Sequence, residues 1–110
     1  MCKGSYLGEF EQLVLVALLR LGDNAYGMKI RQELAQRAER EVAIGAVYAT
    51  LDRLHAKGLV TSWNGEATPE RGGRAKRYFK LTAEGERALR ASRTAWARMW
   101  DGLSFGTVPG

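Results

Sequence analysis

The stretch GAVYATLDRLHAKG, residues 45–58, is predicted to form one helix of about three turns. Val47, Leu51 and Leu54 recur at i, i+4 and i+7, so they form an apolar face that must pack against the rest of the chain. The opposite face is small, hydroxylated or cationic and consists of Ala46, Ala49, Thr50, Arg53 and Lys57. Such a helix is suited to a DNA major groove, and an ordinary amphipathic surface helix is the alternative.

A β-hairpin with a basic loop is predicted directly after this helix. Residues 59–63 (LVTSW) and 77–81 (RYFKL) read as its two strands, and the loop over 64–76 contains Pro69. Glycine in such a loop lets the backbone approach a phosphate closely, and arginine can pair with phosphate or enter a minor groove. The loop residues expected at DNA are Arg71, Gly73, Arg74 and Lys76.

Positive charge is concentrated in this part of the chain. The 110 residues carry a formal net charge of +5, and residues 45–80 hold seven cations against three anions, a net of +4. Residues 1–44 hold six cations and six anions and therefore balance. Concentrated positive charge is typical of a protein that binds a polyanion, because neutralising phosphates releases counterions. A solvated basic face is the alternative.

The first predicted helix, residues 8–21, is hydrophobic around most of its circumference. Apolar residues recur along it at spacings of three and four, and Leu15, Val16 and Leu19 widen the apolar arc. We therefore expect this helix to be covered on more than one side, by its own domain and by a second subunit.

A second helix is predicted over residues 26–38. The alternation of Val42 and Ile44 is compatible with a very short strand over 41–44. The whole order is then helix, helix, helix, strand, loop, strand, which is the layout of a winged helix-turn-helix domain. We expect that domain to span residues 1–81, and the fold to be mainly α with one small β-hairpin.

A fourth helix is predicted over residues 82–103, with Thr82 as its N-cap. Leu89, Trp96 and Leu103 repeat every seven residues, which is coiled-coil spacing. Because so long a helix extends beyond a winged-helix domain, its apolar end is expected to dimerise, and folding back onto its own domain is the alternative. The residues expected in the dimer interface are Leu15, Leu19, Leu89, Trp96, Met99, Trp100 and Leu103.

The side chains that catalysis and metal binding need are scarce. Cys2 and His55 are the only cysteine and the only histidine, so no enzyme activity, metal or cofactor is expected. No apolar run approaches the roughly 20 residues of a membrane span. There is no secretory leader pattern, so we expect a cytoplasmic protein. Residues 104–110 are expected to be a flexible tail.

Four stretches of the chain resemble the PadR family of bacterial transcriptional regulators. They are LGEFEQLVLVALL (7–19), AYGMKI (25–30), IGAVYATLDRLHAKGLV (44–60) and GGRAKRYFKLTAEGE (72–86). They follow one another in the order and spacing of the family. Because one predicted helix follows the hairpin, the chain is similar to the short subfamily with a single C-terminal helix.

The resemblance implies a homodimeric repressor that binds double-stranded DNA at a two-fold symmetric operator. It implies DNA contacts from Tyr48 and from the basic residues Arg71, Arg74 and Lys76 of the hairpin loop. The hairpin with its loop is the wing of a winged-helix domain. In some small members a planar aromatic or drug-like effector binds between tryptophans at the dimer centre, which here implies a pocket at Trp96 and Trp100. Plain packing of these tryptophans is the alternative.

The function predicted from the sequence is therefore DNA-binding transcriptional regulation. Arg53 and Thr50 are expected to read base edges, while Tyr48, Lys57 and the wing cations hold phosphates. A winged-helix module that binds proteins without sequence-specific DNA binding is the alternative.

Overall fold

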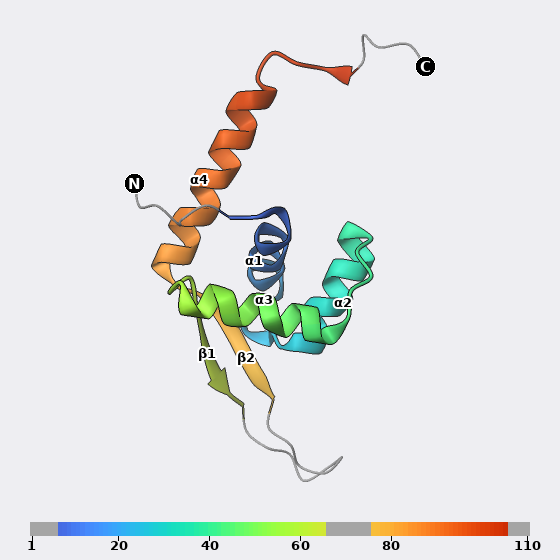
Figure 1. The fold of residues 1–110 in the computed structure, drawn as a ribbon, viewed down its shortest axis with the longest axis vertical. Helices are drawn as coiled ribbons and strands as arrows, with labels where there is room; N and C mark the ends of the chain where they lie inside the picture. Colours follow the sequence, from blue (N-terminus) through green and yellow to red (C-terminus); the bar gives the residue numbers. More distant parts are fainter. Residues whose placement is uncertain (1–6, 66–75, 106–110) are drawn as a thin grey trace.

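The computed structural model describes residues 7–65 and 76–105 (Figure 1). Its elements, in chain order, are α1 (Glu9–Leu21), the short 3-10 helix η1 (Gly22–Asn24), α2 (Gly27–Ala38), α3 (Ile44–Ala56), β1 (Val60–Asn64), β2 (Arg77–Leu81) and α4 (Ala83–Trp100). The predicted fold class is confirmed: helices dominate, and the two strands form one antiparallel hairpin directly after α3. Among the described residues, no helix is both long enough and apolar enough to cross a membrane.

The core lies between α1, α2, α3 and the hairpin. Its largest fully buried side chains are Phe79, Leu15, Ile30, Leu51, Leu54, Val14 and Val47. The predicted apolar face of α3 therefore packs inward, because Val47, Leu51 and Leu54 all belong to this set. Burial of such a stripe is what holds a helix of this length in place.

Leu15 is predicted at the dimer interface, and that prediction is wrong. Its side chain is 0% exposed, because the inward side of α1 runs through Val14, Leu15 and Leu18. Leu19, one turn further along α1, is 56% exposed and lines the groove beside α4 together with the exposed Val16. Only the outer side of α1 is thus available to a second copy.

The hairpin pairs Val60 with Leu81 at one end and Asn64 with Arg77 at the other. A third segment joins it, because the amide of Phe79 donates to the carbonyl of Ala25 at 2.9 Å, next to a single bridge between Tyr26 and Tyr78. The hairpin is therefore attached to the chain segment that leads into α2.

The short strand predicted over residues 41–44 is absent. Residues 41–43 are irregular, and Ile44 already belongs to α3. The carbonyl of Val42 accepts a hydrogen bond from Nε of Arg31 at 2.8 Å, so a side chain rather than a neighbouring strand satisfies it. The bridge to the hairpin is made by Tyr26 instead.

The start of α4 follows the prediction. The hydroxyl of Thr82 accepts a hydrogen bond from the amide of Gly85 at 3.0 Å, so Thr82 is the N-cap. A capping box would place an acidic residue at position 85. A Cβ atom there would lie 2.0 Å from the carbonyl oxygen of Leu59, so the contact between α4 and the chain before β1 requires glycine.

The end of α4 differs from the prediction. The helix stops at Trp100, and Gly102 has φ +79°, in the left-handed region that ends a helix. Leu103 therefore lies beyond the helix, so the expected heptad repeat of Leu89, Trp96 and Leu103 is not carried by one helix. In Figure 1 most of α4 extends away from the other helices, and its last turns have no element packed beside them.

Candidate nucleic-acid interface

α3 lies across one side of the domain with one face open to solvent (Figure 1). Its exposed residues are Gly45, Ala46, Tyr48, Ala49, Asp52, Arg53, His55 and Ala56. No side chain caps its N-terminus, where Ala43 is the N-cap residue. This agrees with the absence of a capping residue in the sequence. Four of these residues, Gly45, Ala46, Ala49 and Ala56, have at most a methyl side chain, so the helix axis can come close to a flat or grooved partner there.

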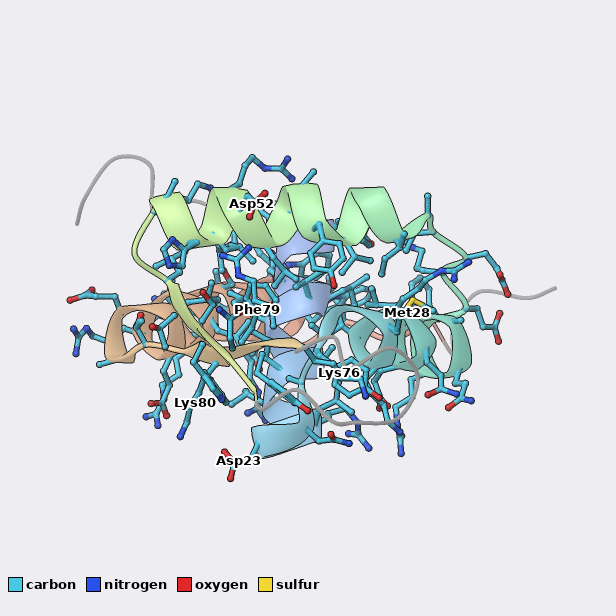
Figure 2. The ribbon with its side chains drawn as sticks, turned by 90° about the horizontal axis from the view of Figure 1, so that it is seen from below. Asp23, Met28, Asp52, Lys76, Phe79 and Lys80 are labelled. Atoms are coloured by element: carbon cyan, nitrogen blue, oxygen red, sulfur yellow. The ribbon has the colours of Figure 1, made fainter. Side chains whose placement is uncertain are left out.

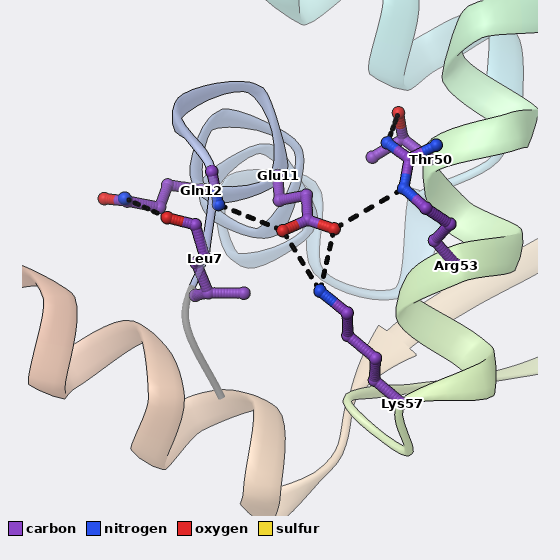
Figure 3. A network of polar contacts seen from close by, with 7 residues as sticks. Leu7, Glu11, Gln12, Thr50, Arg53 and Lys57 are labelled. Carbon is purple, nitrogen blue, oxygen red and sulfur yellow. Dashed lines mark hydrogen bonds and ion pairs between the residues drawn. The ribbon is translucent and has the colours of Figure 1, made fainter. Parts of the chain in front are cut away.

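Thr50 is predicted to read a base edge, and its position does not allow this. Its side chain is 2% exposed, on the inward side of α3 beside Leu51 and Leu54. Its hydroxyl accepts a hydrogen bond from Nη2 of Arg53 at 3.2 Å (Figure 3). Thr50 therefore accepts a hydrogen bond from Arg53 on the inward side of α3 and does not face a DNA groove.

Tyr48 is exposed, and its ring rests against the start of α2. A Cβ atom on Gly27 would lie 2.4 Å from the Tyr48 hydroxyl, so only glycine at position 27 leaves room for the ring. Phe79 supports the ring from the hairpin side, with 6.5 Å between ring centroids. Gly27 is not among the predicted site residues, and the glycine in the AYGMKI stretch is the signal that could have indicated it.

Arg53 and Lys57 both face one carboxylate, that of Glu11 in α1 (Figure 3). The Lys57 ammonium lies 3.1 Å from Oε2 of Glu11, and Nε of Arg53 lies 3.6 Å from the same oxygen. Oε1 accepts a hydrogen bond from the amide of Gly8 at 3.0 Å. The carboxylate thus ties the start of α1 to the last turns of α3, and we call Glu11, Arg53 and Lys57 the charge cluster.

Glu11 is a buried acid that stays ionised. Burial alone would raise its pKa, but the hydrogen bond from Gly8, the contact with Lys57 and the charge of Arg53 together outweigh it and lower the pKa below its ordinary value. The two cations of α3 are therefore partly neutralised from within the domain. Sequence patterns do not indicate this pairing, because Glu11 and Lys57 lie 46 residues apart.

Asp52 and Arg77 form a second link that sequence patterns do not indicate. Nη1 of Arg77 lies 3.6 Å from Oδ1 of Asp52, joining β2 to the open face of α3. Arg77 also donates to the hydroxyl of Ser62, through Nε at 3.3 Å and Nη2 at 3.2 Å. Its guanidinium carbon lies 4.9 Å from the centroid of the Phe79 ring. The Ser62 hydroxyl and the Phe79 ring therefore hold the Arg77 guanidinium beside Asp52.

The base of the wing is built from aromatic rings. Trp63 stacks on Tyr78 with 5.8 Å between centroids, and Tyr78 meets Tyr26 edge-on at 5.5 Å. The Lys76 ammonium lies 4.8 Å from the centroid of Tyr26, so the first described cation after the loop sits beside α2. Figure 2 shows Lys76 and Lys80 on the hairpin, apart from α3. The predicted DNA contacts Arg71, Gly73 and Arg74 lie outside the described residues.

A groove of about 1610 Å³ runs between α1 and α4. Leu13, Val16, Leu19, Leu89 and Trp96 supply its apolar lining. Trp96 is 57% exposed and Met99 is 76% exposed, while Leu89 is half-buried against the core. Trp100 packs edge-on against Phe105, with 5.2 Å between centroids. Of the predicted interface residues of α4, Trp96, Met99 and Trp100 are exposed, and Trp96 lines the groove.

Within residues 7–65 and 76–105, no group of three or more histidine, cysteine, aspartate or glutamate side chains is placed to hold a metal ion.

Comparison with known proteins identifies the family. The family model described as "Transcriptional regulator PadR-like family" matches residues 14–91, from the middle of α1 into α4. Members of a family of transcriptional regulators are generally not enzymes. No curated protein matches the chain significantly.

Solved structures agree with this match. The chain is 26% identical to a PadR family transcription regulator from Clostridium difficile R20291, covering 82% of this chain and 90% of that one, with a TM-score of 0.66. A PadR family transcriptional regulator from Eggerthella lenta is 26% identical over 93% of this chain and 88% of that one, with a TM-score of 0.66. RosR of H. salinarum is 28% identical, covering 89% of this chain and 81% of that one, with a TM-score of 0.68. The chain belongs to the PadR-like family of transcriptional regulators.

Proposed function

We propose that this regulator is a cytoplasmic homodimer that binds double-stranded DNA at a two-fold symmetric operator and represses transcription. Each subunit inserts α3 into a major groove and lays its wing on the neighbouring backbone or minor groove. The two half-sites are then about 10 bp apart, or a small multiple of that distance. The observation that carries the proposal is the open face of α3, on which Gly45, Ala46, Ala49 and Ala56 leave room for close approach, next to the hairpin.

The roles of the residues follow from their positions. Ala46 and Ala49 allow close approach, and Tyr48 is braced by Gly27 where it can meet a phosphate. Arg53 is more than half exposed, so it can turn from Glu11 toward a base edge while Thr50 stays buried. Lys57 and Lys76, together with Arg71, Gly73 and Arg74 in the wing loop, hold phosphates.

The dimer forms through α4 and the outer side of α1. Trp96, Met99 and Leu19 are large apolar side chains with most of their surface exposed; Trp96 and Leu19 line the groove, and Met99 lies one turn after Trp96 on α4. A second copy of α4 laid in this groove covers them, which gives the apolar surface a partner. Leu89, Trp100 and Leu103 extend the same surface. Residues 106–110 of the predicted tail lie outside the described residues.

An effector pocket at Trp96 and Trp100 is the remaining part of the proposal. A flat aromatic or drug-like molecule stacks on tryptophan favourably. If such a molecule binds at the dimer centre, it releases DNA by changing the angle or spacing between the two α3 helices. Quenching of tryptophan fluorescence by a planar cation supports this part. Equal operator affinity with and without that compound would remove it.

The experiment that tests the proposed function is selection of bound sequences from random duplex DNA by the full chain. The expected result is an enriched motif with two-fold symmetry. A winged-helix module that binds only proteins enriches no motif, and an asymmetric motif with a monomeric protein contradicts the dimer. Sedimentation equilibrium on the same sample reports the dimer independently of DNA.

A further inference from the structure

Asp52 is the only acidic residue of α3, and it lies on the open face. Gly45, Ala49, Asp52 and Ala56 follow one another at steps of four, three and four residues, so they form one stripe along the helix, which we call the outer stripe. The other three members have at most a methyl group as side chain. Asp52 therefore supplies the hydrogen-bonding side-chain atoms of the outer stripe, near its middle.

A carboxylate in this place is unfavourable against DNA unless it accepts a hydrogen bond. Phosphates repel it, and the repulsion grows when water is excluded. In the major groove, however, the N4 amine of cytosine is a donor that aspartate can accept from, whereas guanine and thymine present acceptors there. Small neighbours on the outer stripe let the helix approach until a side chain as short as aspartate reaches a base edge.

Arg77 controls how this carboxylate is presented. It faces Oδ1 of Asp52 at 3.6 Å, and its own position is fixed by Ser62 and the ring of Phe79. A carboxylate has two oxygens with about four lone-pair sites, so one oxygen can face Arg77 while the group accepts a bond from DNA. Arg77 also offsets the negative charge, which lowers the repulsion from phosphate.

We propose that Asp52 determines specificity by accepting a hydrogen bond from the N4 amine of a cytosine in the major groove, with Arg77 as its positioning residue. The inference rests on the proposed function, because it requires α3 to lie in the groove. It also couples base reading to the wing, since Arg77 belongs to β2.

The first test compares motifs selected from random duplex DNA by the wild-type chain, Asp52→Asn and Asp52→Ala. The wild type should enrich cytosine at one symmetry-related pair of positions. Asp52→Asn should shift that pair toward adenine, because asparagine pairs with N6 and N7 of adenine. Asp52→Ala should lose the preference there and keep the rest of the motif. Asp23→Asn is the matched control, since Asp23 is exposed in η1 and lies away from α3 (Figure 2).

The second test measures the affinity of each protein variant for two operators, the selected operator and one in which thymine replaces that cytosine. The wild type should lose affinity by about tenfold, the usual scale for one mismatched base pair, and Asp52→Ala by less than about twofold. Arg77→Gln should reduce the ratio of the affinities for the two operators, and Arg77→Lys should restore part of that ratio.

The outcomes distinguish base reading by Asp52 from DNA binding by α3. Equal losses for wild type and Asp52→Ala, with an intact motif, would overturn the reading by Asp52 and leave the proposed function standing. A ratio that stays unchanged in every variant would likewise overturn it, because Asp52 then merely forms a surface ion pair with Arg77. A wild type that enriches no motif overturns both proposals. Thermal melting of each variant checks that it is folded, because Asp52 is exposed but Arg77 is half-buried.

Discussion

The Lys57 ammonium at the end of α3 lies 3.1 Å from the buried carboxylate of Glu11 at the start of α1. This contact fixes α3 against α1, the helix that also forms one wall of the α4 groove. Arg53 shares the same carboxylate, so the charge cluster holds both cations of α3 that are proposed to contact DNA. The orientation of α3 is therefore linked to the side of the domain where a second copy is proposed to bind.

We predict that the charge cluster makes stability depend on pH in the acid range. The pKa of Glu11 is lower in the folded chain than in the unfolded one, because the pairing outweighs the burial. Between the two pKa values the unfolded state binds more protons. The contribution of Glu11 to the free energy of unfolding is therefore complete above its unfolded pKa of about 4.3. It is lost as the pH falls through the folded pKa.

Glu11→Gln should remove this acid sensitivity and lower the free energy of unfolding at neutral pH by about 1–2 kcal/mol. Urea unfolding between pH 3 and 7 checks it. Glu84→Gln is the control, because Glu84 is exposed and pairs only with a neighbour on its own helix. Equal pH profiles for wild type and Glu11→Gln would show that Glu11 does not contribute in this way.

We predict that Gly27→Ala weakens DNA binding through Tyr48. The added methyl group would lie 2.4 Å from the Tyr48 hydroxyl and must displace the ring, which is the end of a flexible side chain. Stability should therefore change by less than about 1 kcal/mol, while operator affinity falls by about fivefold or more. In the Tyr48→Ala background, Gly27→Ala should cause no further loss of affinity. Additive losses would mean that position 27 acts independently of Tyr48.

We predict opposite outcomes for two neighbouring leucines of α1. Leu19→Asp should give a folded monomer, because the side chain is exposed toward the α4 groove. Leu15→Asp should unfold the chain, because it places a charge in a fully buried position. Sedimentation equilibrium and circular dichroism measure the two effects. If Leu19→Asp is still a dimer, the interface lies elsewhere on the molecule.

We predict that the wing cations contribute to affinity without contributing to sequence preference. Each phosphate contact adds about 0.9 to the slope of log affinity against log salt concentration. Because a dimer carries two wings, Arg74→Ala and Lys76→Ala should each reduce the slope by about 2 and leave the selected motif unchanged. Arg87→Ala, at an exposed cation of α4 that does not line the groove, is the control and should leave the slope as it is. An unchanged slope in Arg74→Ala would remove Arg74 from the interface.

Much of the fold follows from local sequence patterns. Apolar spacing identifies α1, α2 and α3 and the inward face of α3, since Val47, Leu51 and Leu54 can share one side only in a helix. The strands and the Thr82 cap follow from short signals of the same kind. These features depend on residues that are near one another in the chain.

Other features depend on residues far apart in the chain, and local patterns do not reveal them. In a helix as hydrophobic as α1, apolar spacing does not distinguish Leu15, which faces the core, from Leu19, which does not. Thr50 is polar, but the packing of α3 buries it and Arg53 satisfies its hydroxyl. The pairing of Glu11 with Lys57 joins residues from different helices, and periodicity carries no information about it.

Methylation interference on the selected operator tests most directly whether two copies place α3 in successive major grooves. Methylation at N7 of guanine alters the major groove, where α3 is proposed to lie. We expect interference in two patches related by two-fold symmetry, about 10 bp apart or a small multiple of that distance. A single patch, or binding that is indifferent to methylation throughout the operator, would contradict this placement of the two helices.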